Sequence, residues 1–139
     1  MPNLVTRNVA DVIRAWVAAT NAHDAEQVAA LYSPHAQLLY TWGELLDGQQ
    51  SISQHFADFF HAFPTWEKQP YSLIHGNHDW GVLEWQAHAT FMGRYRDREP
   101  TGRSFQLRGC GVFHVVDGQI RLHRRYLDRR AWYRQLGIE

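Results

Sequence analysis

Two side chains near the end of the chain, His123 and Arg125, have types and spacing suited to chemistry. They stand two apart in a strand expected over residues 119–126, so they share one face, with side chains roughly 7 Å apart. Arginine stays charged at any working pH and can hold a carboxylate or an oxyanion through two parallel hydrogen bonds. Histidine titrates near neutrality and can act as an acid or a base. Tyr40, in an earlier expected strand, could donate a hydrogen bond to a carbonyl.

The same residues also have a purely structural interpretation. Arg125 would then pair with a nearby carboxylate such as Asp128 or Glu44, and His123 would be hydrogen-bonded within the core. A buried arginine without a partner is very costly, so a partner has to exist. Either a protein carboxylate or an anionic ligand can fill that place, and the sequence leaves both open.

Periodicity predicts the elements that position these residues. Apolar residues at helical spacing predict a helix over residues 5–20, and Asp24 with Gln27 gives the box-like start of a second, short helix. The segment "SPH", at 33–35, is expected to end that second helix. A strand over 36–43 and a turn or short hairpin over 43–48 follow. A third helix is predicted over 49–63, with Pro64 as its stop.

After Pro64 the apolar period changes to two, which is typical of half-buried strands. Strands are predicted over 66–79, 82–95, 104–116 and 119–126, with a loop at 94–103 and a tight turn at 116–119. Asp128 is the expected cap of a last short helix that ends at Gly137. The order indicates one α+β domain over residues 1–139. Three helices would pack on a curved antiparallel sheet and enclose a pocket, as in a cone.

The composition is that of an ordinary globular protein, with one exception. Aromatic residues make up 14% of the 139 residues, which favours a large apolar cavity or an interface. Cys110 is the single cysteine, so no internal disulfide is possible, which suits a reducing compartment. The first residues lack the pattern of a signal peptide, and no apolar run reaches the length of a membrane span. We therefore expect a cytoplasmic protein with no membrane partner.

The charge is unevenly distributed along the chain. Residues 1–93 carry three basic and nine acidic residues, whereas residues 94–139 carry eleven arginines and five acidic residues. A basic half is one mark of nucleic-acid binding. The alternative is an arginine-bearing outer sheet face that pairs with the acidic half, within one chain or across a dimer. The chain has one lysine and no purely basic stretch, so we expect no nucleic-acid partner.

Ordered phrases along nearly the whole chain resemble the SnoaL-like branch of the NTF2-like superfamily. They are "WVAATNAHDAEQVAALYSPHA" at 16–36, "DGQQSISQHFADFFHAFP" at 47–64, "EWQAHATFMG" at 84–93, "PTGRSFQLRGCGVFHVVDGQI" at 100–120 and "LDRRAWYRQLG" at 127–137. The resemblance implies a cone-shaped fold shared by polyketide cyclases, ketosteroid isomerases, epoxide hydrolases and non-catalytic binders. It implies an architecture and not a single reaction.

The catalytic positions of these relatives hold other residue types here. Ketosteroid isomerases have a tyrosine, an aspartate that acts as the general base, and a second acid. At the corresponding positions this chain has Trp16, Tyr40 and Gly111. SnoaL-type cyclases and limonene-type epoxide hydrolases share an aspartate on the last strand, and that place is occupied by Arg125. The cyclase histidine corresponds to Gly111, and the additional Arg and Asp of the hydrolases correspond to Trp85 and Ala87. The resemblance therefore argues against all three well-known mechanisms.

The resemblance also implies which residues face the pocket. Arg121, His123 and Arg125 would be the inward set of the last strand. The alternation over 82–95 independently gives an apolar wall of Leu83, Trp85, Ala87, Ala89 and Phe91. Gly109 and Gly111 share one strand face, where they either open room for a ligand or let the sheet bend. The expected pocket residues are Trp16, Phe56, Phe60, Trp85, Phe91, Gly109, Gly111 and Phe113.

Other titratable residues rank lower. "HGNHD", at 75–79, lacks a clear third metal ligand, so no metal site is expected. His88 and Glu84 share the polar outer face of a strand. His55 and His61 are expected at the surface of the third helix, and Cys110 is expected to serve packing.

These observations lead to three function hypotheses. The first is a cofactor-independent enzyme, an isomerase, cyclase or lyase, that moves protons on a hydrophobic carbonyl compound, with Tyr40, His123 and Arg125 as catalytic residues. The second is a non-catalytic binder of a small hydrophobic anion held by Arg125. The third and most distant is a nucleic-acid or protein adaptor. The resemblance adds a homodimer through a sheet face that bears Gln86, His88, Arg108 and Tyr126.

Overall fold

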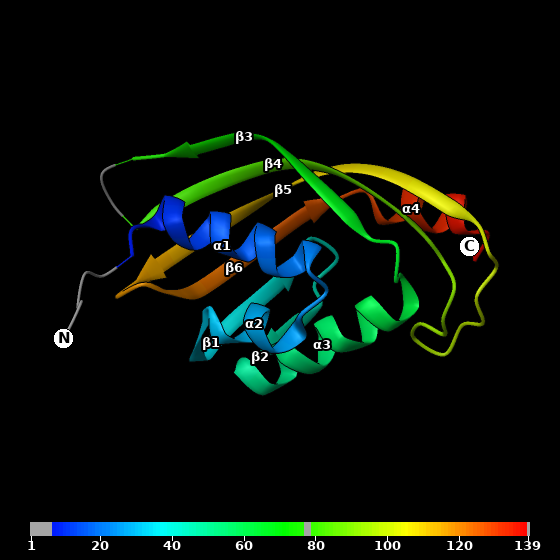
Figure 1. Cartoon of the computed structure of the whole chain (residues 1–139), viewed down its shortest axis with the longest axis horizontal. Helices are drawn as coiled ribbons and strands as arrows, with labels where there is room; N and C mark the ends of the chain where they lie inside the picture. The colour runs from blue at the N-terminus through cyan, green and yellow to red at the C-terminus, as the bar shows by residue number, and fades with distance from the viewer. Residues whose placement is uncertain (1–6, 77–78, 139) are drawn as a thin grey trace.

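The computed structural model describes residues 7–76 and 79–138. Helices and strands follow one another there in the predicted order (Figure 1). Their bounds are α1 Val9–Asn21, α2 Ala25–Ala30, β1 Tyr32–Tyr40, β2 Leu45–Asp47, α3 Gln49–Ala62, β3 Glu67–His75, β4 Trp80–Thr90, β5 Ser104–Val116, β6 Gln119–Leu127 and α4 Arg129–Leu136. The α+β cone expected from the sequence is confirmed.

The six strands form one sheet in the order β2-β1-β6-β5-β4-β3. We expected an antiparallel sheet, and the sheet is mixed, because β1 runs parallel to β6 while the other neighbours are antiparallel. In this parallel pair Leu38 lies opposite His123, and Tyr40 lies opposite Arg125. Figure 1 shows α1, α2 and α3 on one side of the curved sheet. The sheet therefore brings the first and last strands together beneath the helices.

Helices α1, α2 and α4 each begin after a side chain whose oxygen accepts a backbone hydrogen bond. The carboxylates of Asp24 and Asp128 accept hydrogen bonds from the backbone N–H groups of Gln27 and Ala131, which confirms both predicted caps. The first helix begins later than expected. Asn8 caps it and Val9 is its first residue, whereas residues 5 and 6 lie outside the described residues.

Two strand predictions need correction. "SPH", at 33–35, does not end the second helix in a loop, because strand β1 begins at Tyr32 and includes all three residues. Arg121 was expected to face inward and is exposed. The β5–β6 register shifts between His114 and Val115, so Ile120 takes the inward place and is fully buried.

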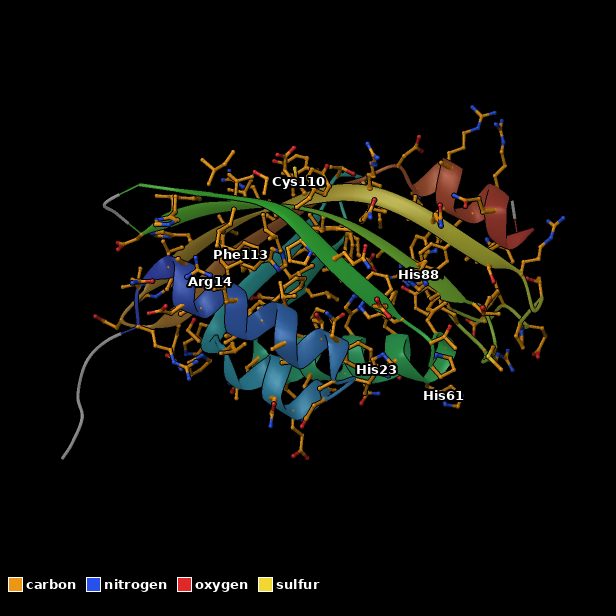
Figure 2. The ribbon with its side chains drawn as sticks, turned by 45° about the horizontal axis from the view of Figure 1, so that its top comes forward. Arg14, His23, His61, His88, Cys110 and Phe113 are labelled. Atoms are coloured by element: carbon orange, nitrogen blue, oxygen red, sulfur yellow. The ribbon has the colours of Figure 1, made fainter. Side chains whose placement is uncertain are left out.

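The core lies between the sheet and the three helices, and the alternation of β4 supplies one wall. The five β4 and post-β4 side chains predicted to face inward are buried: Leu83, Trp85, Ala87, Ala89 and Phe91. On the opposite face Gln86, His88, Arg108 and Tyr126 are exposed. Figure 2 shows Cys110 on the sheet and Phe113 on the side of α1. The homodimer through the outer face stays a prediction.

Candidate active site

A small cavity lies between the sheet, α3 and α4. Its wall consists of aromatic and apolar residues with one charged group: Tyr40, Phe59, Trp66, Trp85, Phe105, Leu107, Arg125, Leu127 and Trp132. The space open to the centre of a water-sized sphere is about 20 Å³, which is room for the oxygen end of a ligand or for one or two waters. The aromatic content favoured a large apolar cavity or an interface. The aromatic rings instead fill most of the space between the sheet and the helices.

Arg125 and Tyr40 meet at this cavity. The Nη1 of Arg125 donates a hydrogen bond to the Tyr40 hydroxyl at 3.0 Å, and the same hydroxyl lies 2.7 Å from Nε2 of His55. Arginine can only donate, so of the two neighbours of the Tyr40 hydroxyl only His55 can accept its proton. The Tyr40 O–H therefore donates to Nε2 of His55. The order Arg125, Tyr40, His55 is thus a directed chain of buried hydrogen bonds, with Tyr40 stacked on Trp42 at 4.5 Å between ring centroids.

His123 lies in a second chain of the same kind. The indole N–H of Trp16 donates to the Tyr32 hydroxyl at 3.0 Å, and that hydroxyl lies 2.8 Å from Nδ1 of His123. Since the indole can only donate, Nδ1 accepts from Tyr32, and Nε2 carries the proton of the neutral ring. The His123 ring stacks on Phe113 at 4.0 Å. It does not line the cavity, so the three residues predicted to be catalytic do not all meet: Tyr40 and Arg125 do, and His123 stands apart.

Burial sets the proton state of both chains. It lowers the pKa of His55 to about 3, helped by the charge of Arg125, and it lowers the pKa of His123 well below its ordinary value for the same two reasons. Burial also raises the pKa of Tyr32 and of Tyr40, and the nearby Arg125 opposes both shifts. Both histidines are therefore neutral and both tyrosines are protonated throughout the physiological range.

The carboxylates proposed as partners of Arg125 are bound elsewhere. Glu44 forms an ion pair with Arg96 at 2.9 Å, and Asp128 caps α4. The Nε of Arg125 is buried without a hydrogen-bond partner. Its guanidinium instead lies 5.4 to 5.9 Å from the ring centroids of Trp16, Tyr40 and Trp85. Aromatic faces stabilise the charge in part but do not accept the remaining N–H groups.

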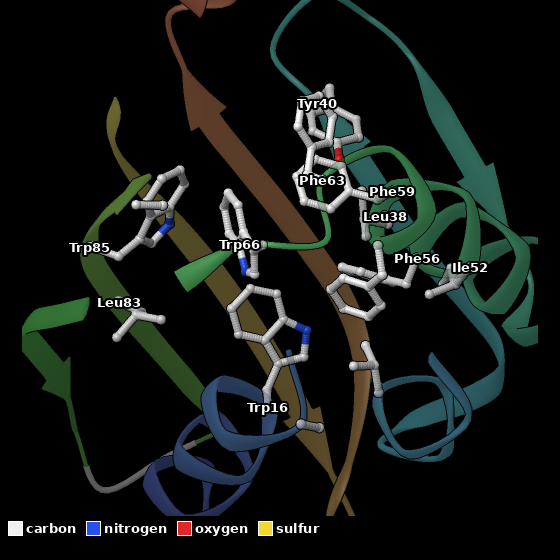
Figure 3. Close-up of a cluster of buried hydrophobic side chains, with 14 of the residues drawn as sticks. Trp16, Leu38, Tyr40, Ile52, Phe56, Phe59, Phe63, Trp66, Leu83 and Trp85 are labelled. Atoms are coloured by element: carbon white, nitrogen blue, oxygen red, sulfur yellow. The ribbon is translucent and has the colours of Figure 1, made fainter. Parts of the chain in front are cut away.

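Lys68, the single lysine of the chain, is a site residue that the sequence reasoning missed. It is 2% exposed, and its Nζ has no hydrogen-bond partner. Nζ lies 4.0 Å from the ring centroid of Trp16, 4.4 Å from that of Trp85 and 5.2 Å from that of Trp66. Figure 3 shows these three indoles grouped beneath the sheet. The available signal was the period of two, because a buried Trp66 places residue 68 on the same inward face.

The three indoles favour a cation at Nζ, but two stronger effects oppose it. Burial removes the water that would solvate an ammonium, and the charge of Arg125 repels it, so the pKa of Lys68 falls well below its ordinary value. An ammonium also carries three N–H donors, and the described residues offer Nζ no acceptor. Both effects shift Lys68 from the ammonium toward the neutral amine.

Unpartnered donors gather around this one cavity. Among the described residues, four side-chain atoms are buried without a hydrogen-bond partner, and all four are nitrogens: Trp66 Nε1, Lys68 Nζ, Arg125 Nε and Trp132 Nε1. Trp66, Arg125 and Trp132 line the cavity, and Lys68 contacts two rings of its wall. Buried polar groups are normally satisfied, so such a concentration indicates a place for hydrogen-bond acceptors supplied by a ligand.

The expected pocket residues divide into three groups. Trp85 lines the cavity, and Trp16 borders it through Lys68 and Arg125. Phe56, Phe60, Phe91 and Phe113 are buried in the aromatic core but do not line the cavity. The two glycines make room for neighbouring rings. A Cβ at Gly109 would lie 2.6 Å from Trp85, and one at Gly111 would lie 2.8 Å from Nε2 of His123.

The other titratable residues singled out in the sequence, where the structure describes them, lie outside the cavity lining. His61 is exposed as expected, but His55 is buried, because its ring turns inward to Tyr40. No cluster of potential metal ligands occurs among residues 7–76 and 79–138, and residues 77 and 78 of "HGNHD" lie outside them. No helix within these ranges is long and apolar enough to cross a membrane.

Comparison with known proteins places this geometry in context. A family model described as a SnoaL-like domain matches residues 13–123. No curated protein sequence matches the chain. Similar solved structures include a proposed SnoaL-like polyketide cyclase from Jannaschia sp. CCS1, with a TM-score of 0.85 and 14% identity over 100% of this chain and 98% of that one.

Two further structures come from Streptomyces. IdmH, a proposed polyketide cyclase from Streptomyces antibioticus, has a TM-score of 0.77 and 22% identity over 94% of this chain and 99% of its own. AclR, a proposed hydroxylase from Streptomyces galilaeus, has a TM-score of 0.79 and 20% identity over 92% of this chain and 80% of its own. At these identities the likeness establishes the shared fold.

Proposed function

The chain belongs to the SnoaL-like family, and on that premise we propose that it is a cofactor-independent enzyme that moves a proton on a hydrophobic carbonyl compound. Cyclisation, isomerisation and dehydration of such compounds share this step, the loss of a proton next to a carbonyl. Support comes from the family, from the proposed cyclases that share the fold, and from the cavity itself.

One observation carries the proposal: the cavity presents buried donors, including a permanent cation, and its lining holds no carboxylate. A ligand that fits must bring acceptor oxygens. When a proton passes from the carbon next to a carbonyl to a water molecule, negative charge develops on the carbonyl oxygen. The Arg125 guanidinium, in a site with little water, would stabilise that charge more than it stabilises the neutral carbonyl, which is the requirement for catalysis.

Tyr40 and His55 would keep Arg125 in place. The Tyr40 proton is directed to His55, so the hydroxyl oxygen remains free to accept from Arg125. In this scheme Tyr40 orients the guanidinium and touches the ligand at the cavity wall. His123 serves as a positioning residue, because its accepting nitrogen is taken by Tyr32 and its ring supports Trp16.

The test is exchange of carbon-bound hydrogen for deuterium in an aryl ketone such as 1-tetralone, followed by NMR in D₂O. Arg125→Met should slow the protein-catalysed exchange by about 10²-fold or more, as expected for the loss of an oxyanion donor. Arg124→Met is the matched control, because Arg124 is the exposed neighbour on the same strand. Equal rates in the two variants, or no exchange by the parent protein, would contradict the proposal.

The absence of a carboxylate from the cavity lining favours a second candidate, a non-catalytic binder of a small hydrophobic anion. Such a protein would bind an aromatic carboxylate, with quenching of tryptophan fluorescence, and would lose that binding in Arg125→Met. It would accelerate no exchange. Binding without exchange therefore selects the second candidate, and binding of the ketone with exchange selects the first.

A further inference from the structure

We propose that Lys68 is a covalent site: its amine condenses with one carbonyl of a 1,3-dicarbonyl compound while the second carbonyl oxygen binds Arg125. The proposal rests on the proposed function for the role of Arg125. The reactivity of Lys68 rests on its own surroundings.

The lone pair of the Lys68 amine is free of partners among the described residues. Nζ is buried, and no described residue hydrogen-bonds to it or pairs with it as an acid. The charged or titratable side chains that act on it or feel its charge are Arg125 and His123, and neither is an acid. An amine held toward its neutral form in this way is a better nucleophile than an exposed lysine, which is almost entirely protonated at neutral pH.

Lys68 also lies next to the cavity. Trp66 and Trp85 contact the lysine amine and also line the cavity, and Arg125 lines the cavity beside Trp85. A compact dicarbonyl whose oxygen is held by Arg125 would therefore lie within the aromatic walls that flank Nζ. The cavity is small, so the compound that reacts is a compact one.

The reaction balances without a further reagent. The amine nitrogen attacks the carbonyl carbon, and the carbonyl oxygen takes a proton to form a carbinolamine. The carbon–oxygen bond then breaks, the oxygen leaves as water with both amine protons, and a carbon–nitrogen double bond forms. A proton on the imine nitrogen makes it an electron sink, so the carbon between the two carbonyl positions loses its proton more readily.

The aromatic surroundings of Nζ suit a protonated imine better than an ammonium. An ammonium at Nζ brings three N–H groups into a site without acceptors, whereas a protonated imine brings one. The three indole faces attract either cation. The indole group thus stabilises an iminium at a lower cost in unsatisfied hydrogen bonds than an ammonium.

The experiment uses pentane-2,4-dione, sodium cyanoborohydride and the folded protein at pH 7, with intact-mass and peptide analysis. The chain has one lysine, so the α-amino group is the only other primary amine and serves as an internal reference. The Arg124→Lys variant adds an exposed lysine on the same fold as a second reference. We expect an adduct of one diketone less one water plus the two hydrogens added by the reduction on Lys68, formed at least tenfold faster than on the amine introduced by Arg124→Lys.

Failure has a clear signature. An unlabelled Lys68 in a sample whose α-amino group is labelled would overturn the proposal, and so would labelling no faster than that of the introduced amine. Lys68→Met should fold, as monitored by near-ultraviolet circular dichroism, and should lack the internal adduct. If it does not fold, the comparison of Lys68 with the introduced amine still decides the question.

The same samples separate this proposal from the proposed function. Deuterium exchange that depends on Arg125, in a protein whose Lys68 stays unlabelled, overturns the covalent site and leaves the enzyme proposal standing. Rapid labelling of Lys68 without any exchange does the reverse. Both results together, with exchange lost in Lys68→Met, would support a covalent mechanism.

Discussion

Strand β1 carries a tyrosine at each end, and each tyrosine binds a histidine with a donor behind it. At the first end the order is Trp16, Tyr32, His123, and at the other it is Arg125, Tyr40, His55. The distances differ little, and both histidines are kept neutral by burial. What differs is the donor, which is a neutral indole in the Tyr32 chain and a permanent cation in the Tyr40 chain.

That difference separates a structural network from a candidate catalytic one. The Tyr32 chain lies away from the cavity, because none of its members lines it. The Tyr40 chain is open at one end, where Arg125 keeps an unpartnered Nε at the cavity wall. Both chains contain a tyrosine–histidine pair. Only the pair whose donor is the charged Arg125, at the cavity wall, is a candidate for catalysis.

The largest predicted effect tests what the two chains share. Both histidines have lowered pKa values in the folded state, so the unfolded chain binds more protons below about pH 6.5 and stability falls as the pH drops toward the folded pKa, about 3 for His55. Each histidine should contribute on the order of 1.4 kcal/mol per pH unit to this loss. Urea unfolding between pH 7 and pH 4.5 measures the slope.

Single variants attribute that slope to each chain. His55→Gln and His123→Gln should each reduce the pH dependence by about one proton relative to the parent, whatever their absolute stability. A slope that neither variant changes would show that burial does not keep the histidines neutral.

The second prediction tests what separates the chains. Tyr32→Phe and Tyr40→Phe each leave two buried groups unpaired, so each should lower the free energy of unfolding by about 1 to 3 kcal/mol. Only Tyr40→Phe should also slow deuterium exchange or weaken carboxylate binding, by about tenfold, because only Tyr40 orients Arg125 at the cavity. Equal effects of both variants on binding would remove the distinction.

The smallest prediction concerns a feature found only beside His123. A Cβ at Gly111 would lie 2.8 Å from the ring of His123 and 3.1 Å from that of Phe113, so Gly111→Ala should cost about 1 to 2 kcal/mol through overpacking. The denaturation midpoint should fall while exchange per folded molecule stays near that of the parent. A large loss of exchange would place His123 closer to the chemistry than the geometry does.

Much of the fold could be predicted because its signals are local. The caps at Asp24 and Asp128 and the alternation of β4 depend on neighbouring residues. The parallel pairing of β1 with β6 and the bulge that turns Arg121 outward depend on residues far apart in the sequence, and no local pattern specifies them.

The site was harder to predict for the same reason. Tyr40 and Arg125 were chosen from their types and from the family resemblance, but the burial of His55 follows from a tyrosine on another element. Lys68 was overlooked because lysine in a strand is usually exposed. Its position on the face of Trp66 was the available sign, and the indoles that surround it come from three separate elements.

The parallel register of β1 and β6 also has a consequence for the order of assembly. Tyr40 and Arg125 are 85 residues apart in the chain, and the strand that carries Arg125 follows the other described strands of the sheet. During synthesis helices α1 to α3, Lys68 and the long strands before β6 exist before the guanidinium does. The donor-lined cavity therefore cannot form until β6, with Arg125, and α4, with Trp132, have been synthesised.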